Sequence, residues 1–273
     1  MYKINIFVTN ECNAKILNPL PGAPGVCDFC FRPIESIISS EKMIERIINS
    51  LDLIEVREPI TLTGGEPLVS KYISFLIEML KEKNHRISLN TNGLLLSKNE
   101  EILSKINYIC LPFDGHCAEL ADYYRGEGYY QISQNAYKLA HKYNLPIGVH
   151  TLVTPHNILK LEEMGNYLSN QPFSHNIWYW YIKRFKKINH ALYTNTTQYE
   201  LNENLYQQSI FNVKTKFSKM FIGASERESK GYTTLYISLD GNVFIYKKGQ
   251  AKNTLIGNVM QESLNSIILH NFL

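Results

Sequence analysis

The chain has 273 residues, 44% of them hydrophobic, which is enough to bury one large domain or one domain with a small appendage. Its 28 basic and 25 acidic residues leave a net charge of +3, so charge gives no reason to expect a nucleic-acid or membrane partner. No apolar run approaches the roughly 18–20 residues that span a bilayer, and the N-terminal segment lacks the features of a signal peptide. Five clustered cysteines do not suit a disulfide framework. We therefore expect a cytoplasmic protein.

Strand-like and helix-like patterns alternate along the first two thirds of the chain. Strands are expected at residues 2–8, 59–63, 86–90, 107–113, 146–153 and 176–185. Helices are expected at residues 41–55, 70–83 (with Ser70 as N-cap), 99–106, 130–143 and 158–169. Six strand-plus-helix repeats predict an α/β fold. It is a partial (β/α)6 barrel over residues 1–189, open on one side, with its reactive site at the carboxyl ends of the strands.

The pattern changes after residue 190. We expect a helix at 198–210, a hairpin of residues 232–237 and 243–246 around Asp240-Gly241-Asn242, and a terminal helix at 263–270. Residues 190–273 are therefore predicted to form a small C-terminal α+β appendage.

Three cysteines follow the first predicted strand with the spacing Cys12-x14-Cys27-x2-Cys30. Prolines and glycines in the long gap allow the loop to fold back. Three thiolates can hold a four-iron cluster and leave one iron open to a small molecule. A structural zinc site and unrelated core thiols are the alternatives. Zinc usually takes four protein ligands, and no second close Cys or His pair is evident.

Polar or glycine residues follow each of the next three strands. Gly64 comes after the second strand, Asn92 after the third and Asp114 after the fourth, as Cys12 does after the first. Because parallel strands end at the same edge of a sheet, these residues are predicted to share one site.

The cysteine spacing resembles that of the radical S-adenosylmethionine (SAM) superfamily. The usual motif there is Cys-x3-Cys-x2-Cys with an aromatic residue before the last cysteine, which Phe29 matches. This chain expands the first gap, as some members of the 7-carboxy-7-deazaguanine synthase group do. The resemblance implies that Cys12, Cys27 and Cys30 hold a [4Fe–4S] cluster and that SAM chelates its fourth iron.

The turn Gly64-Gly65-Glu66-Pro67 matches the GGEP motif of that superfamily, which binds the SAM amino group. Glycines let the backbone approach a ligand closely, and Glu66 can accept a hydrogen bond from an ammonium group. Alone, the motif would be an ordinary strand-to-helix turn. Its position after the cysteine triad makes it specific.

Weaker matches extend the resemblance. Asn90 and Asn92 belong to an Asn-Thr-Asn-Gly segment that faces SAM in the family, or forms a simple turn. Asp114 and Arg125 belong to an Asp-Gly…Arg-Gly stretch, in which Arg125 is either a partner of the SAM carboxylate or a solvated helix arginine. Thr151 lies on the fifth strand, whose residues commonly approach the adenine.

The resemblance also implies the reaction. A reduced cluster cleaves SAM to a 5′-deoxyadenosyl radical, which takes hydrogen from a substrate, and a reductant such as flavodoxin or ferredoxin supplies the electron. Cys110 shares the parity of Asp114 on the fourth strand. Its thiol could return a hydrogen atom to a substrate radical, or it could be a small core residue.

The C-terminal segments 240–246 and 256–259 resemble the SPASM/twitch extension of peptide-modifying members. Tyr246 stands where that extension has a cluster cysteine, so we expect a degenerate extension without a second cluster. A peptide or ribosomal peptide precursor is the first substrate hypothesis. A small metabolite such as a nucleotide or pterin is the second, and a non-catalytic, cluster-binding regulatory protein is the third.

Overall fold

The computed structural model describes residues 2–23, 26–32, 36–187, 191, 194, 196–224, 233–245 and 253–272. The strands are β1 Tyr2–Thr9, β2 Ile60–Gly64, β3 Ile87–Asn90, β4 Tyr108–Pro112, β5 Ile147–Val153, β6 Ile177–Arg184, β7 Ile222–Ala224, β8 Thr233–Ser238, β9 Asn242–Ile245 and β10 Thr254–Asn258. The α-helices are α1 Glu41–Leu51, α2 Ile73–Glu82, α3 Ala118–Arg125, α4 Tyr129–Lys142, α5 Leu161–Ser169, α6 Glu203–Lys216 and α7 Leu264–Phe272.

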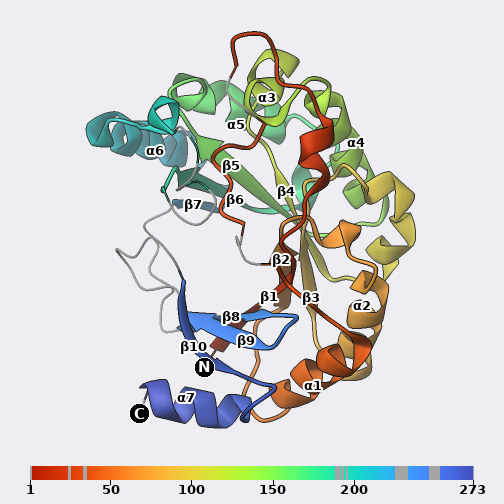
Figure 1. Cartoon of the computed structure of the whole chain (residues 1–273). Helices are drawn as coiled ribbons and strands as arrows, with labels where there is room; N and C mark the ends of the chain where they lie inside the picture. The colour runs from red at the N-terminus through yellow and green to blue at the C-terminus, as the bar shows by residue number, and fades with distance from the viewer. Residues whose placement is uncertain are drawn as a thin grey trace.

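The described strands form one sheet in the order β10-β9-β8-β1-β2-β3-β4-β5-β6-β7. Strands β1 to β6 are parallel and adjacent in chain order, with a helix or short helical turns between successive strands. Figure 1 shows α2, α4 and α5 packed along the outside of the curved sheet. The sheet is not closed, because β10 and β7 are its two edges. The predicted partial barrel is confirmed.

The two faces of the sheet differ in chemistry because side chains alternate along each strand. One set packs with the helices in the main hydrophobic core, including Ile4, Ile60, Ile87, Ile109 and Val149. The other set defines what we call the inner face. Its members include Asn5, Ser88, Asn90, Cys110, His150, Tyr179 and Lys183, which alternate with core residues. The fold thus presents a row of polar groups on the side away from the helices.

Several boundaries differ from the predictions. Helix α2 begins at Ile73 rather than at residue 70, because Pro67–Val69 forms a short 3-10 turn and Ser70 Oγ accepts from the Tyr72 amide at 3.3 Å. The segment expected to be helical at 99–106 is a 3-10 turn at Glu100–Ser104. Sequence patterns also missed α3, β7 and β10, which have eight, three and five residues.

The C-terminal strands continue the barrel sheet. Strand β8 pairs in parallel with β1, from Tyr2 opposite Thr233 to Phe7 opposite Ser238. Strands β8 and β9 form the predicted antiparallel hairpin, with Gly241 at a φ of +90° in its turn. The proposed boundary at residues 189 and 190 and the substituted position Tyr246 lie outside the described residues.

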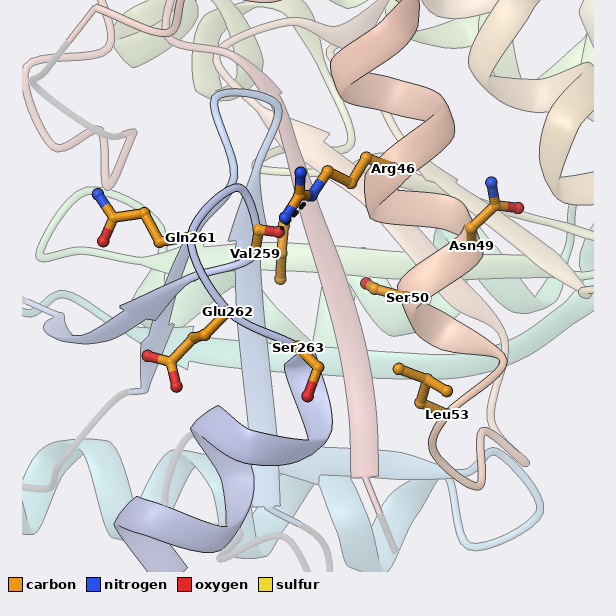
Figure 2. A pocket seen from close by; sticks show the side chains of 8 residues that line it. All are labelled: Arg46, Asn49, Ser50, Leu53, Val259, Gln261, Glu262 and Ser263. Carbon is orange, nitrogen blue, oxygen red and sulfur yellow. Dashed lines mark hydrogen bonds between the residues drawn. The ribbon is translucent and has the colours of Figure 1, made fainter.

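The C-terminal segment also contacts α1. Arg46 Nε donates to the Val259 carbonyl at 2.8 Å, beside a surface pocket between α1 and residues 259–263 (Figure 2). None of the predicted site residues lines this pocket. These groups connect α1 to the C-terminal segment, and none of them belongs to the predicted site.

Candidate active site

The structure brings the three predicted cysteines together beyond the carboxyl end of β1. Cys12 precedes a short helical turn, Asn13–Ile16, and the Cys30 amide donates to the Cys27 carbonyl at 2.9 Å. Burial raises the pKa of Cys27 to about 12. The Arg125 guanidinium opposes this rise, and the neighbouring thiols of Cys30 and Cys12 add to it. Negative charge on the Cys27 and Cys30 sulfurs is therefore costly without a cation, which is what a metal cluster supplies.

The positions of the three thiols bear on the kind of metal group that they could hold. In the described part of the chain, no three His, Cys, Asp or Glu side chains converge as the ligands of one metal ion would. The three thiols nevertheless lie close enough to interact electrostatically. In a four-iron cluster each thiolate binds a different iron, so the sulfurs stand apart.

The glycine turn lies directly against the segment that leads to Cys12. The Gly65 amide donates to the Thr9 carbonyl at 2.6 Å, and the Glu66 amide donates to the Glu11 carbonyl at 2.7 Å. A Cβ atom on Gly65 would lie 1.9 Å from the Glu11 oxygen, and Gly64 has a φ of +133°. Only glycine allows this close approach, which fixes Cys12 beside the Gly64–Pro67 turn.

The Glu66 carboxylate is buried and engaged within the protein. It accepts hydrogen bonds from the Leu68 amide at 3.1 Å, the Thr91 hydroxyl at 2.7 Å and the Asn92 amide at 2.7 Å. Burial raises its pKa to about 7, and these three donors oppose the rise. The Glu66 carboxylate therefore links the Gly64–Pro67 turn to the turn after β3.

Two asparagines, one at the end of β3 and one in the turn after it, face the site in different ways. Asn92 Nδ2 lies 3.6 Å from Cys12 Sγ and donates to Asn13 Oδ1 at 3.0 Å. Asn90 Oδ1 is buried and has no hydrogen-bond donor among the described residues. Because an unpaired buried carbonyl is costly, this oxygen indicates a place for a polar ligand. The site residues therefore fit a cofactor that carries hydrogen-bond donors.

Arg125 and Phe29 form the opposite wall of the cysteine loop. Arg125 Nε donates to Asp114 Oδ2 at 2.7 Å, while Asp114 Oδ1 accepts from the Leu152 amide at 2.7 Å. Arg125 Nη1 lies 3.8 Å from Cys27 Sγ, and its guanidinium carbon lies 4.8 Å from the Phe29 ring centre. The arginine predicted to meet the SAM carboxylate is thus held between the Asp114 carboxylate and the Cys27 thiol.

Two predicted residues lie on opposite faces of the sheet. Thr151 is fully buried on the helix side, where its hydroxyl donates to the Phe113 carbonyl at 2.5 Å and accepts from Trp180 Nε1 at 2.8 Å. The structure therefore does not bring Thr151 to the site. Cys110, by contrast, lies on the inner face of β4, with Sγ 3.0 Å from Tyr179 Oη.

Sequence reasoning missed the chain of polar groups that continues from Cys110. Tyr179 Oη lies 3.2 Å from His150 Nε2, and His150 Nδ1 lies 3.2 Å from Lys183 Nζ. Ser88 Oγ completes the row at 3.7 Å from Cys110 Sγ. The sequence carried a signal for this chain in the alternation of polar and apolar residues along β5 and β6. The polar residues alternate there with Val149, Trp180 and Ile182, which lie in the core.

The family model of the radical SAM superfamily matches residues 17–168, more than half of the chain, which therefore belongs to this superfamily. A GTP 3′,8-cyclase of Campylobacter jejuni is 36% identical over 95 residues, which are 34% of this chain and 28% of the cyclase. An uncharacterized protein of Methanothermobacter thermautotrophicus is 28% identical over 162 residues, 55% of this chain and 60% of that protein. The chain thus matches less than a third of the length of such cyclases.

Solved structures agree on the fold. Native anSMEcpe with bound AdoMet and a Cp18Cys peptide has a TM-score of 0.75 at 17% identity, over 99% of this chain and 80% of that one. Streptococcus suis SuiB has a TM-score of 0.65 at 16% identity, over 97% of this chain and 64% of that one. The protein is an enzyme of the radical SAM superfamily, whose cofactors are a [4Fe–4S] cluster and SAM. Among the described residues, no helix has the length and apolar character needed to cross a membrane.

Proposed function

We propose that Cys12, Cys27 and Cys30 hold the cluster and that SAM binds between the Gly64–Pro67 turn and Asn90. The observation that carries this proposal is the meeting of three mutually interacting thiols with a glycine turn packed against the same loop. The unpaired oxygen of Asn90 supports a polar ligand on the adjoining strand. When bound, the cluster and SAM supply a one-electron cleavage that yields a carbon radical able to take hydrogen from a substrate.

The protein's own residues hold and shield this site. Phe29 packs edge-on against Tyr124 and Tyr199, with ring centres 6.3 and 5.6 Å apart, and so screens the cysteine loop from water. Arg125 places a positive charge beside Cys27. The Asn92 side-chain amide places a hydrogen-bond donor beside Cys12. The Arg125 contact favours the thiolate form of Cys27, which a cluster requires.

We further propose that the substrate binds on the inner face beside Cys110 and that Cys110 can donate a hydrogen atom there. Two substrate classes have support. The fold resembles anSMEcpe, which was solved with a peptide, and this favours a peptide. The partial match to GTP 3′,8-cyclase favours a small metabolite such as a nucleotide. A cytoplasmic flavodoxin or ferredoxin is the proposed electron donor.

The experiment is anaerobic reconstitution with iron and sulfide, reduction with dithionite and addition of SAM. The readout is 5′-deoxyadenosine measured by chromatography. The parent and a Cys117→Ala control should form it, because Cys117 lies outside the triad. A Cys27→Ala, Cys30→Ala variant should not. Binding of zinc without iron would overturn the cluster assignment. SAM binding by a fully loaded enzyme that never cleaves it, even with candidate peptides and nucleotides added, would favour the regulatory alternative.

A further inference from the structure

Lys183 stands out among the groups of the inner face because no carboxylate of the described residues pairs with its charge. Its ammonium group contacts His150 Nδ1 at 3.2 Å and lies 5.5 Å from the Tyr181 ring centre. Within the described part of the chain, no carboxylate lies within ion-pair distance of Lys183. A cation that is largely removed from water is costly unless it is paired.

The nearby charges do not neutralise Lys183. The Asp114 carboxylate is already bound by Arg125 Nε and by the Leu152 amide. Burial lowers the pKa of Lys183 to about 8; Arg125 and Lys3 act in the same direction, while Cys110 and Asp114 oppose the shift. Burial also lowers the pKa of His150 well below its usual range, so its imidazole is neutral at pH 7. Among the described residues, no carboxylate on this face therefore neutralises the positive charge of Lys183.

The hydrogen-bond pattern orients the neighbouring groups around that charge. The Lys183 ammonium can only donate, so His150 Nδ1 must accept, and the neutral ring carries its proton on Nε2. His150 Nε2 then donates to Tyr179 Oη, which lies 3.0 Å from Cys110 Sγ. The Lys183 ammonium keeps two further N–H groups for a ligand. Lys183, His150 and Tyr179 are all partly exposed, so a ligand can reach them.

We propose that Lys183 binds an anionic oxygen group, a carboxylate or a phosphate, of the substrate on the inner face. This inference rests on the proposed function, because it places the substrate beside Cys110 and the cluster. A lysine ammonium is a compact charge that pairs with either group. The buried Asn5 Oδ1, which has no donor among the described residues, is a second unpaired polar atom on the same face. This unpaired oxygen indicates that the ligand carries hydrogen-bond donors as well as an anionic group.

The test uses the reconstituted enzyme saturated with SAM, so that the carboxylate of SAM is already in place. Inorganic phosphate and acetate are titrated separately by calorimetry into the parent, Lys183→Met, Lys183→Arg and Lys187→Met. Lys187 is a matched control, because it lies four residues further along and is exposed. We expect saturable binding to the parent and to Lys187→Met. Lys183→Met should bind about tenfold to a hundredfold more weakly, the size expected for a lost charged hydrogen bond.

Each outcome decides a separate question. Tighter binding of phosphate assigns a phosphorylated substrate, and tighter binding of acetate assigns a carboxylate. The proposal is overturned if Lys183→Met and Lys187→Met bind the anions equally well. It is also overturned if neither the parent nor Lys183→Arg binds them. Loss of SAM affinity in Lys183→Met also overturns it, because the anion would then be that of SAM. Cluster loading and 5′-deoxyadenosine are measured on the same samples, so failure of the cluster assignment is seen independently of anion binding.

Discussion

The guanidinium of Arg125 lies between the Cys27 thiol and the Asp114 carboxylate, 3.8 Å from the first and 2.7 Å from the second. The carboxylate in turn accepts the Leu152 amide from β5. A cysteine from the loop after β1 is thereby linked to the ends of α3 and β5. This relationship makes Arg125 a structural support of the cysteine loop, in addition to any contact with SAM.

Replacing Arg125 by Met should destabilise the protein by about 3–5 kcal/mol, because the Asp114 carboxylate would remain buried without its partner. The Asp114 side chain is 2% exposed and that of Arg125 is 16% exposed. Urea denaturation measures the change in the free energy of unfolding. The double variant Asp114→Asn, Arg125→Met should recover part of the loss, since the buried charge is gone.

A surface ion pair provides the control. Lys83 and Asp52 have side chains that are 33% and 47% exposed, so Lys83→Met should cost at most about 1 kcal/mol. Equal losses for Lys83→Met and Arg125→Met would show that the Arg125 contact is no stronger than an exposed pair.

Replacing Gly65 by Ala should displace the segment that carries Cys12. The added Cβ would lie 1.9 Å from the Glu11 carbonyl oxygen, and backbone on both sides would have to move. We expect a loss of about 1–3 kcal/mol in the free energy of unfolding and a lower iron content after reconstitution.

The matched change is Gly22→Ala, in the loop between Cys12 and Cys27. Nothing lies within 4 Å of the added Cβ, so only its φ of +76° imposes a cost, about 1–2 kcal/mol. Iron content should be unchanged in this variant. A Gly65→Ala protein that loads iron as fully as Gly22→Ala would show that the close approach is not needed for the cluster.

The alternating patterns were sufficient to predict the barrel and the meeting of its motifs at one edge. Apolar residues such as Ile60 and Ile87 recur at every second position of the strands, and the helices between them have clear apolar faces. Strand β7 escaped prediction because three residues carry too little periodicity. Thr151 was predicted to approach the adenine, but the structure places it on the helix side, where its hydroxyl is bound to Phe113 and Trp180. The resemblance alone did not determine which face its side chain takes.

The inner-face chain could not be predicted from local sequence for a different reason. Cys110, His150 and Lys183 come from three strands, and only the register that places Pro112 opposite His150 and His150 opposite Tyr181 brings them together. Register between parallel strands is set by tertiary packing of the whole sheet. A search for polar residues at alternate positions of neighbouring strands would have found the members, but not their order.

The proposed role of Cys110 can be tested without a substrate. Thiol hydrogens exchange with solvent, so in D2O the thiol becomes S–D while carbon-bound hydrogens stay unchanged. If the radical formed on SAM cleavage reaches Cys110, part of the 5′-deoxyadenosine should gain one deuterium, measured by mass spectrometry. We expect Cys110→Ala to remove most of that deuterium and to leave the yield of 5′-deoxyadenosine similar.

Cys117→Ala is the control for this experiment, because Cys117 precedes α3 and is not part of the inner-face chain. It should retain the deuterium of the parent. Equal deuterium in the parent and Cys110→Ala would show that the Cys110 thiol does not meet the radical.

Acetate binding to the SAM-loaded enzyme should depend on pH through Lys183, whose pKa burial lowers to about 8. Below that pH the ammonium is charged and affinity should be constant. Above it the charge is lost, and affinity should fall by up to tenfold per pH unit. His150 adds no charge near pH 8, because its pKa is lowered, and Tyr179 stays neutral, because burial raises its pKa. Acetate is the probe, because phosphate itself titrates near neutral pH.

Lys183→Arg separates this titration from every other charge that faces the site, including Lys3, Asp114 and Arg125. A guanidinium keeps its charge throughout, so this variant should bind acetate with nearly constant affinity from pH 7 to about pH 10. The contrast between a falling parent curve and a flat variant curve would assign the titrating group to Lys183. Parallel curves would assign the pH dependence to another group and leave Lys183 outside the anion contact.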